Sequence, residues 1–212
     1  MLSTTRPRTA ILPDGTRILI RRLTPDDAPL LAEAFTRLSQ ESRRLRFLTA
    51  KENLSEAELR YLTEVDGHRH EALGAIDPGS GQGIAVGRFV RDERDPSRAE
   101  VAITVADDWQ RRGLGKLLLS QLADRARHEG IRRFTALVST DNRGMKALLE
   151  RLAASTRVSR VRGNTAEYEI ELAPKGLGAH LEAALRATAA GHLRVPPRLR
   201  EALRALVPLR LR

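Results

Sequence analysis

A glycine-containing loop between a predicted strand and a predicted helix constrains this chain more than any other feature. The β-branched run 101–105 is followed by the polar segment 108–112, and then by Gly113, Gly115 and a leucine-rich stretch. At such a junction the first N–H groups of the helix lack partners and lie at the positive end of the helix dipole. Glycine also lets a phosphate approach the backbone closely. The segment predicts a site for a phosphate-bearing ligand, with an ordinary turn as the alternative.

Two common phosphate-binding loops do not fit this segment. The GxxxxGK[ST] loop needs another glycine spacing and a hydroxyl after the lysine, whereas Lys116 is followed by Leu117. The GxGxxG fingerprint needs a third glycine where Leu118 stands. The remaining pattern is Q-x-x-G-x-G, from Gln110 to Gly115. In this form it resembles the coenzyme A pyrophosphate loop of the GNAT superfamily of N-acetyltransferases.

The order of the predicted elements also resembles that superfamily. Hydrophobic periodicity and turn signals predict strands near 17–22, 70–76, 83–90, 99–105, 133–139, 155–160 and 166–172, and helices near 24–38, 39–47, 55–63, 113–130 and 143–152. The expected fold class is α/β (α+β): the GNAT fold, with a central, mixed, mostly antiparallel sheet of about seven strands flanked by helices. The resemblance covers residues 17–173. Residues 1–16 are expected to form an N-terminal hairpin arm, turning at Asp14 and Gly15.

The C-terminal segment 174–212 lies outside this pattern and is strongly basic. The whole chain has a formal net charge of +10, and the part from Lys175 onward carries eight basic and two acidic residues. Residues 178–190 and 197–207 are candidate short helices that could lie on a membrane, bind a partner or polyanion, or pack on their own domain. An arginine-rich composition explains the charge equally well. Aromatic residues make up only 3% of the chain, so no specific nucleic-acid partner is expected.

Several kinds of site are excluded by composition. The chain has no cysteine, which rules out disulfides and thiolate chemistry, and its five histidines show no metal-ligand spacing, so no metal is expected. The N-terminus lacks the apolar core of a signal peptide, and no run approaches the roughly 20 apolar residues of a membrane span. A soluble, cytoplasmic protein is the expectation.

Acetyl transfer to an amine requires a base, because a free lysine amine with a pKa of about 10.4 is protonated near pH 7. Strand alternation puts Glu100, Ala102 and Thr104 on one face, so an acid lies among small residues that leave room for a substrate. Burial there would raise the pKa of Glu100. In the GNAT superfamily this strand frequently carries the catalytic glutamate, which the resemblance assigns to Glu100. The alternative is a solvated charge at a strand start. The other candidate carboxylates are Glu167, Glu169, Asp107 and Asp108.

The resemblance also implies which residues bind acetyl-CoA, the expected co-substrate. The backbone of Ile103, Thr104 and Val105 should pair with the pantetheine amides like an added strand. The segment Gln110, Arg111, Arg112, Gly113, Leu114 and Gly115 should hold the pyrophosphate, with Arg111, Arg112 and Lys116 as further phosphate contacts, or else solvated. Asn142 matches an asparagine near the coenzyme arm, or is only a helix cap.

The chain departs from the superfamily pattern at two points. Many relatives carry a tyrosine that protonates the leaving thiolate, where this chain has Leu149, and neither Tyr61 nor Tyr168 matches that position. Water could protonate a thiolate of ordinary pKa instead. The usual Gly-Phe after that helix is replaced by Ala153 and Ala154.

The segments 38–47, 54–59, 62–66 and 142–145 look like the bacterial protein-lysine acetyltransferase branch. This resemblance implies a protein lysine as the acceptor. A small amine of the polyamine or aminoglycoside type is the alternative acceptor. A second alternative is a non-catalytic module that binds acetyl-CoA.

Overall fold

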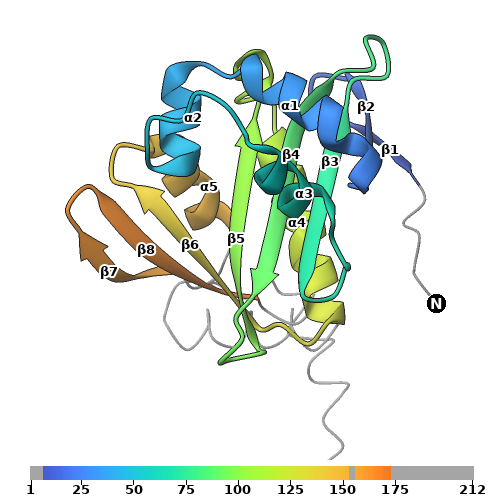
Figure 1. Cartoon of the computed structure of the whole chain (residues 1–212). Coiled ribbons are helices and arrows are strands. Elements are labelled where there is room, and N and C mark those ends of the chain that lie inside the picture. Colours follow the sequence, from blue (N-terminus) through green and yellow to red (C-terminus); the bar gives the residue numbers. More distant parts are fainter. Residues whose placement is uncertain (1–6, 153–155, 173–212) are drawn as a thin grey trace, which may run out of the picture. The chain divides into compact units, whose positions relative to one another are not determined.

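The computed structural model describes residues 7–152 and 156–172 as a single mixed sheet with helices on both faces (Figure 1). The eight strands lie in the order β1-β2-β3-β4-β5-β6-β8-β7, and only the β5–β6 pair is parallel. The strands are β1 (Arg8–Ile11), β2 (Arg17–Arg22), β3 (His70–Ile76), β4 (Gly83–Arg91), β5 (Arg98–Val105), β6 (Arg133–Ser139), β7 (Thr156–Arg162) and β8 (Thr165–Glu171). The helices are α1 (Ala28–Thr36), α2 (Gln40–Phe47), α3 (Glu56–Thr63), α4 (Leu114–His128) and α5 (Arg143–Leu152), with 3-10 turns η1 (Pro25–Asp27) and η2 (Asp107–Trp109).

The main core lies between the sheet and α4, the helix that follows the glycine loop. Leu118 and Leu122, one turn apart on α4, are fully buried against β3, β4 and β5. Gly87 in β4 faces this helix, and a Cβ there would lie only 2.8 Å from the Leu122 Cδ1 atom. The glycine therefore allows the close approach that holds α4, and with it the loop, against the sheet.

The opposite face of the sheet carries α1 and α3, while α2 lies beside the ends of β5 and β6 (Figure 1). The starts of these helices follow from local sequence. The hydroxyl of Ser39 accepts a hydrogen bond from the Ser42 backbone N–H and caps α2. Ser55 and Glu58 form the predicted capping box of α3. These caps fix where the two helices begin, while contacts with β5 and β6 hold α2 at the end of the sheet where the glycine loop lies.

Most predicted boundaries are confirmed, and the differences are local. The predicted arm is part of the sheet, because residues 8–11 form β1 and pair with β2 around the expected turn, which makes eight strands rather than seven. The helix expected over 24–38 is a 3-10 turn followed by α1, which ends at Thr36. The candidate helices of the 174–212 tail and the Ala153–Ala154 departure lie outside the described residues.

Candidate active site

The glycine loop presents free backbone donors at the start of α4. Gly113 is the N-cap of this helix with φ of +90°, a left-handed conformation that favours glycine. No acceptor in the described ranges bonds the N–H groups of residues 113–116. Leu114 is buried in the core, so it can offer a ligand only its backbone. This cluster of donors fits a pyrophosphate as the sequence predicts.

The parallel strands β5 and β6 diverge beside this loop. Their pairing covers only Arg98 to Glu100 against Arg133 to Thr135, although β5 continues to Val105 and β6 to Ser139 (Figure 1). From Val101 onward, the side of β5 that faces β6 has no partner strand, which leaves room for an extended chain alongside Ile103, Thr104 and Val105. The pantetheine arm expected from sequence therefore fits this gap.

Gln110 connects the loop to its surroundings through its side-chain amide. Its Nε2 donates to the carbonyl oxygen of Val105 at 3.2 Å and to the Ser42 hydroxyl at 3.1 Å. Asp107, one of the alternative acids, accepts hydrogen bonds from the Ser39 and Ser42 hydroxyls and from the Ser39 backbone N–H. Both residues thus tie α2 to the loop, which makes Asp107 a poor candidate for the base.

The three basic side chains of the loop have different surroundings. The Nε of Arg112 donates to Asp14 at 2.7 Å, its Nη2 donates to Thr16 at 2.7 Å, and its guanidinium stacks over Trp109. Hydrogen bonds from Thr16, and then from Arg112, lower the pKa of Asp14 to about 2. Arg112 is therefore engaged with the β1–β2 turn, whereas Arg111 and Lys116 are exposed.

Asn142 caps α5, as one of its two sequence interpretations predicts. Its side-chain oxygen accepts a hydrogen bond from the Met145 N–H at 2.9 Å. Leu149, at the position where relatives carry a tyrosine, is 1% exposed and packs in the core. Tyr168 is also buried, and burial raises the pKa of its phenol. Leucine has no proton to donate, and the buried phenol of Tyr168 is not open to a thiolate in the gap between β5 and β6.

Glu100 lies on β5 at the last pair before the strands diverge, on the face predicted from alternation. The side chain of Glu100 is exposed, so the prediction that it is buried is wrong for the protein without substrate. Its neighbours on the same face, Ala102 and Thr104, are too small to cover it. No hydrogen bond or ion pair engages its carboxylate within the described part of the chain. It is thus available to a substrate.

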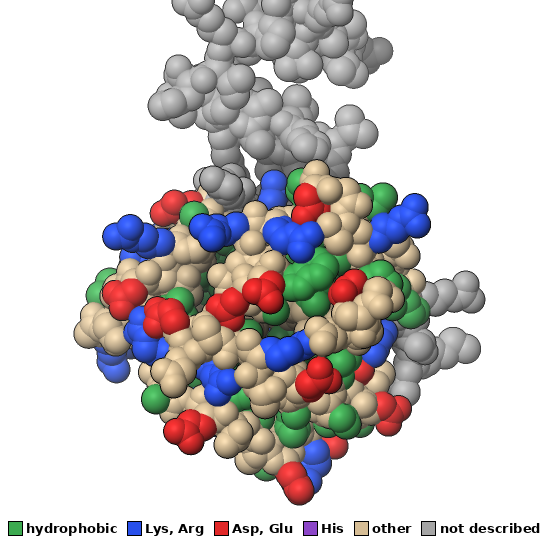
Figure 2. Space-filling model, turned by 90° about the horizontal axis from the view of Figure 1, so that it is seen from above, with side chains coloured by type: hydrophobic (Ala, Val, Ile, Leu, Met, Phe, Trp, Pro, Cys, Tyr) green, Lys and Arg blue, Asp and Glu red, His purple; other side chains and the backbone are tan. Residues whose placement is uncertain are grey.

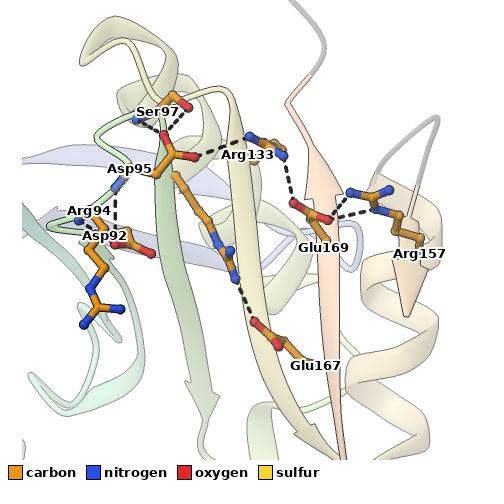
Figure 3. A network of polar contacts seen from close by, with 9 residues as sticks. Asp92, Arg94, Asp95, Ser97, Arg133, Arg157, Glu167 and Glu169 are labelled. Atoms are coloured by element: carbon orange, nitrogen blue, oxygen red, sulfur yellow. Dashed lines mark hydrogen bonds and ion pairs between the residues drawn. The ribbon is translucent and has the colours of Figure 1, made fainter. Parts of the chain in front are cut away.

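Two of the alternative acids are paired with arginines. Glu169 accepts hydrogen bonds from Arg133 and Arg157, which lie on either side of it in Figure 3. Glu167 accepts one from Arg98 at 2.8 Å. These pairs join β5, β6, β8 and β7 and take up both carboxylates.

Two arginines on the face of Glu100 are not predicted from the sequence as parts of the site. Arg88 stands opposite Ala102 in the β4–β5 register, and Arg46 projects from α2. Both line an apolar cavity of about 70 Å³ between the sheet and α1. The opposite charge of Glu100 acts on Arg46, so the two side chains share one electrostatic environment. In an arginine-rich chain, no local signal distinguishes these two.

Seen from the end of the molecule towards which β5 runs, acidic and basic side chains alternate with hydrophobic ones (Figure 2). Among the described residues, this face therefore carries no continuous basic patch. Within residues 7–152 and 156–172, no helix is long and apolar enough to cross a membrane. The same residues hold no cluster of potential metal ligands.

The fold and loop geometry agree with comparisons to known proteins. The model of the "Acetyltransferase (GNAT) domain" family matches residues 17–155. The chain belongs to the GNAT acetyltransferase family. Its sequence places it in the protein acetyltransferase-like branch of that family.

Three relatives support this branch. Acetyltransferase Pat of Mycolicibacterium smegmatis is 36% identical over 140 residues, which are 66% of this chain and 42% of that protein. Acetyltransferase PA5475 of Pseudomonas aeruginosa is 32% identical over 65% of this chain and 74% of its own length. The GNAT domain of S. lividans PAT superposes with a TM-score of 0.72 at 29% identity, covering 78% of this chain and 96% of that domain. The chain thus spans less than half of the mycobacterial relative.

Proposed function

We propose that this chain transfers the acetyl group of acetyl-CoA to the side-chain amine of a protein lysine, with Glu100 as the general base. The observation that carries the proposal is the placement of Glu100. It is an unpaired carboxylate at the point where β5 and β6 diverge, on the strand that leads directly into the glycine loop. The similarity to Pat of M. smegmatis and to PAT of S. lividans supports a protein acceptor.

In the proposed binding mode, the N–H groups of residues 113–116 bind the pyrophosphate, and Arg111 and Lys116 add charge. The backbone of Ile103, Thr104 and Val105 binds the pantetheine arm in the gap beside β5. Gln110 and Arg112 hold the loop in place through their hydrogen bonds, and the Asn142 side-chain amide lies at the opposite side of the gap.

The reaction balances without any further cofactor. Glu100 accepts a proton from the lysine ammonium, directly or through one water, and the neutral nitrogen attacks the thioester carbonyl carbon. A C–N bond forms and the C–S bond breaks, so that the thiolate leaves with the bonding electron pair. Since Leu149 has no acidic proton and the Tyr168 phenol is buried, water is the proposed proton donor to the thiolate.

The Glu100 assignment is tested by the Glu100→Gln variant, which keeps the side-chain volume and removes the base. Turnover with a lysine substrate should fall by about 10²- to 10⁴-fold at pH 7. Acetyl-CoA should bind as before, because Glu100 lies outside the loop. Release of free thiol measures the rate, and the thermal shift produced by acetyl-CoA measures binding.

Asp108→Asn is the matched control, because Asp108 is another exposed acid and lies three residues beyond the C-terminal end of β5. It should keep normal turnover. Near-normal turnover of Glu100→Gln at pH 7 would contradict the assignment. If acetyl-CoA stabilises the protein but no protein or small amine releases thiol, the non-catalytic module is the correct interpretation. Turnover with small amines alone would favour the other alternative.

A further inference from the structure

The cavity beside Glu100 contains two arginines without carboxylate partners. Arg88 is only 5% exposed and Arg46 is half-buried, yet within the described residues no carboxylate lies within ion-pair distance of either guanidinium. Arg21, another partly buried arginine, pairs with Asp27 at 2.5 Å, and Arg43, which has no carboxylate partner, donates to three backbone carbonyl oxygens. Within the described residues Arg46 has neither kind of partner, and Arg88 donates to a single backbone carbonyl oxygen.

The contacts that these arginines do make are with neutral groups. Arg88 Nη1 lies 3.1 Å from the His70 Nε2 atom, and its Nη2 donates to the Leu62 carbonyl oxygen at 3.1 Å. Arg46 stacks over the Phe47 ring, with its Cζ 5.0 Å from the ring centroid. Within the described residues, no hydrogen bond uses the five N–H donors of Arg46. Its guanidinium is thus free to bind a ligand.

Both guanidinium groups carry their charge at pH 7, as arginines in proteins do, although their surroundings oppose it. Burial, and then the positive charge of Arg46, lower the pKa of Arg88 to about 9. Burial also lowers the pKa of Arg46, and the charge of Glu100 offsets this in part. His70 is neutral at this pH, since burial lowers its pKa to about 4. Two positive charges therefore line the cavity. Glu100 acts on that of Arg46, and the carboxylate among the lining residues, Asp27, is already paired with Arg21.

A surplus of positive charge in an apolar cavity is unfavourable unless an anion compensates it. Phe35, Phe47 and Leu62 are among the apolar residues that line this cavity. A carboxylate suits a guanidinium better than other common groups do, because two parallel N–H···O bonds can form. An incoming substrate that carries a carboxylate would supply the missing charge.

We propose that Arg46 binds a carboxylate of the acceptor substrate, with Arg88 as a second positive charge behind it. The acceptor lysine then has an acidic residue next to it in its protein. This inference rests on the proposed function, and it names the class of lysine that the enzyme selects. Arg46 is a specificity residue that touches the substrate, whereas Arg88 acts through Arg46.

The spacing of the site agrees with this substrate. Arg88 pairs with Ala102, which is the next residue after Glu100 on the same face of β5. Side chains two positions apart on a strand are about 7 Å apart. Adjacent side chains of a substrate peptide can span a distance of that order. The amine can therefore reach Glu100 while a neighbouring carboxylate reaches the arginine pair.

Two peptides test the proposal, identical except that one carries Asp and the other Asn next to a single lysine. With the unaltered protein, kcat/KM from free-thiol release should be about tenfold higher for the Asp peptide, as one charge-assisted contact provides. The Arg46→Gln variant should reduce this preference to about twofold or less. The KM for acetyl-CoA should not change, which separates loss of specificity from misfolding.

Arg94→Gln is the matched control, because Arg94 is an exposed arginine in the loop between β4 and β5 and should leave the preference intact. Arg46→Lys keeps the charge but not the bidentate geometry, so an intermediate preference is expected. Equal kcat/KM values for the two peptides with the unaltered protein would overturn the proposal. A preference that survives in Arg46→Gln would do the same.

A separate binding measurement distinguishes failure of this inference from failure of the proposed function. If neither peptide is acetylated, lysine acetylation fails, but the carboxylate subsite is still tested with glutarate as the probe. Saturable thermal stabilisation of the unaltered protein, and none of Arg46→Gln, supports the subsite, whereas equal shifts overturn it. Free glutamate as the preferred acceptor would support the subsite and overturn the protein acceptor.

Discussion

His70 illustrates at the residue scale how burial of one side chain gives the whole fold a pH dependence. Burial, followed by the positive charge of Arg88, lowers the pKa of this imidazole from 6.5 to about 4. The unfolded chain therefore binds a proton between these two pH values that the folded chain does not bind. The free energy of unfolding must fall as the pH drops through this window, and the contribution is fully present above pH 6.5.

We expect this group to contribute about 1–2 kcal/mol to the loss of stability between pH 6.5 and 4, after allowance for solvent screening. The measurement is a comparison between two proteins, so that the contributions of all other groups cancel. Urea unfolding of the unaltered protein and of His70→Gln should be followed at both pH values. The variant should lose less stability on acidification, and an equal loss in both proteins would contradict the assignment.

The β1–β2 turn and the glycine loop act together at the scale of elements. The turn contributes Asp14 and Thr16, which bond Arg112, and Pro13, whose Cδ would lie 3.2 Å from a Cβ at position 113. The loop in turn bonds α2 through Asp107 and Gln110. The loop N–H groups proposed to bind the pyrophosphate are therefore held between the β1–β2 hairpin on one side and α2 on the other.

This arrangement predicts that Asp14→Asn weakens acetyl-CoA binding, although the Asp14 side chain does not contact acetyl-CoA in the proposed binding mode. The ion pair is exposed and makes a small contribution, so the KM for acetyl-CoA should rise about two- to fivefold. The KM for the acceptor and kcat should stay the same, because the variant loosens only the loop. Initial rates at varied concentrations of each substrate measure the three constants.

Asp26→Asn serves as the comparison, since Asp26 is an exposed acid in η1 that makes no contact with the loop. It should leave all three constants unchanged. An unaltered KM for acetyl-CoA in Asp14→Asn would show that Arg112 does not need its partner to hold the loop.

At the scale of the whole molecule, the buried core identified in the described residues runs from Leu12 to Ile170. The proposed domain boundary near residue 173 lies beyond it. A chain that ends at Leu172 is therefore expected to unfold cooperatively and to keep the thermal stabilisation by acetyl-CoA. Circular dichroism during heating, with and without acetyl-CoA, measures both properties. Loss of the cooperative transition would show that residues 173–212 belong to the domain.

Local patterns in the sequence were sufficient to predict much of the fold and part of the candidate site. The two glycines between a β-branched run and a leucine-rich run predicted the loop, because helix starts and positive φ angles depend on neighbours within one turn. Alternation placed Glu100 on the correct face for the same reason, since strand periodicity is a local property. Hydroxyl residues three positions before acids predicted the helix caps.

Tertiary structure alone decided the surroundings of these residues. Arg112 is bound by Asp14, which lies 98 positions away, and only the pairing of β1 with β2 beside the loop brings them together. The exposure of Glu100 depends on where β5 and β6 separate. The approach of Arg46 to Arg88 depends on how α2 lies against the sheet. Electrostatic interactions act through space, so their partners are set by the packing of elements rather than by spacing along the chain.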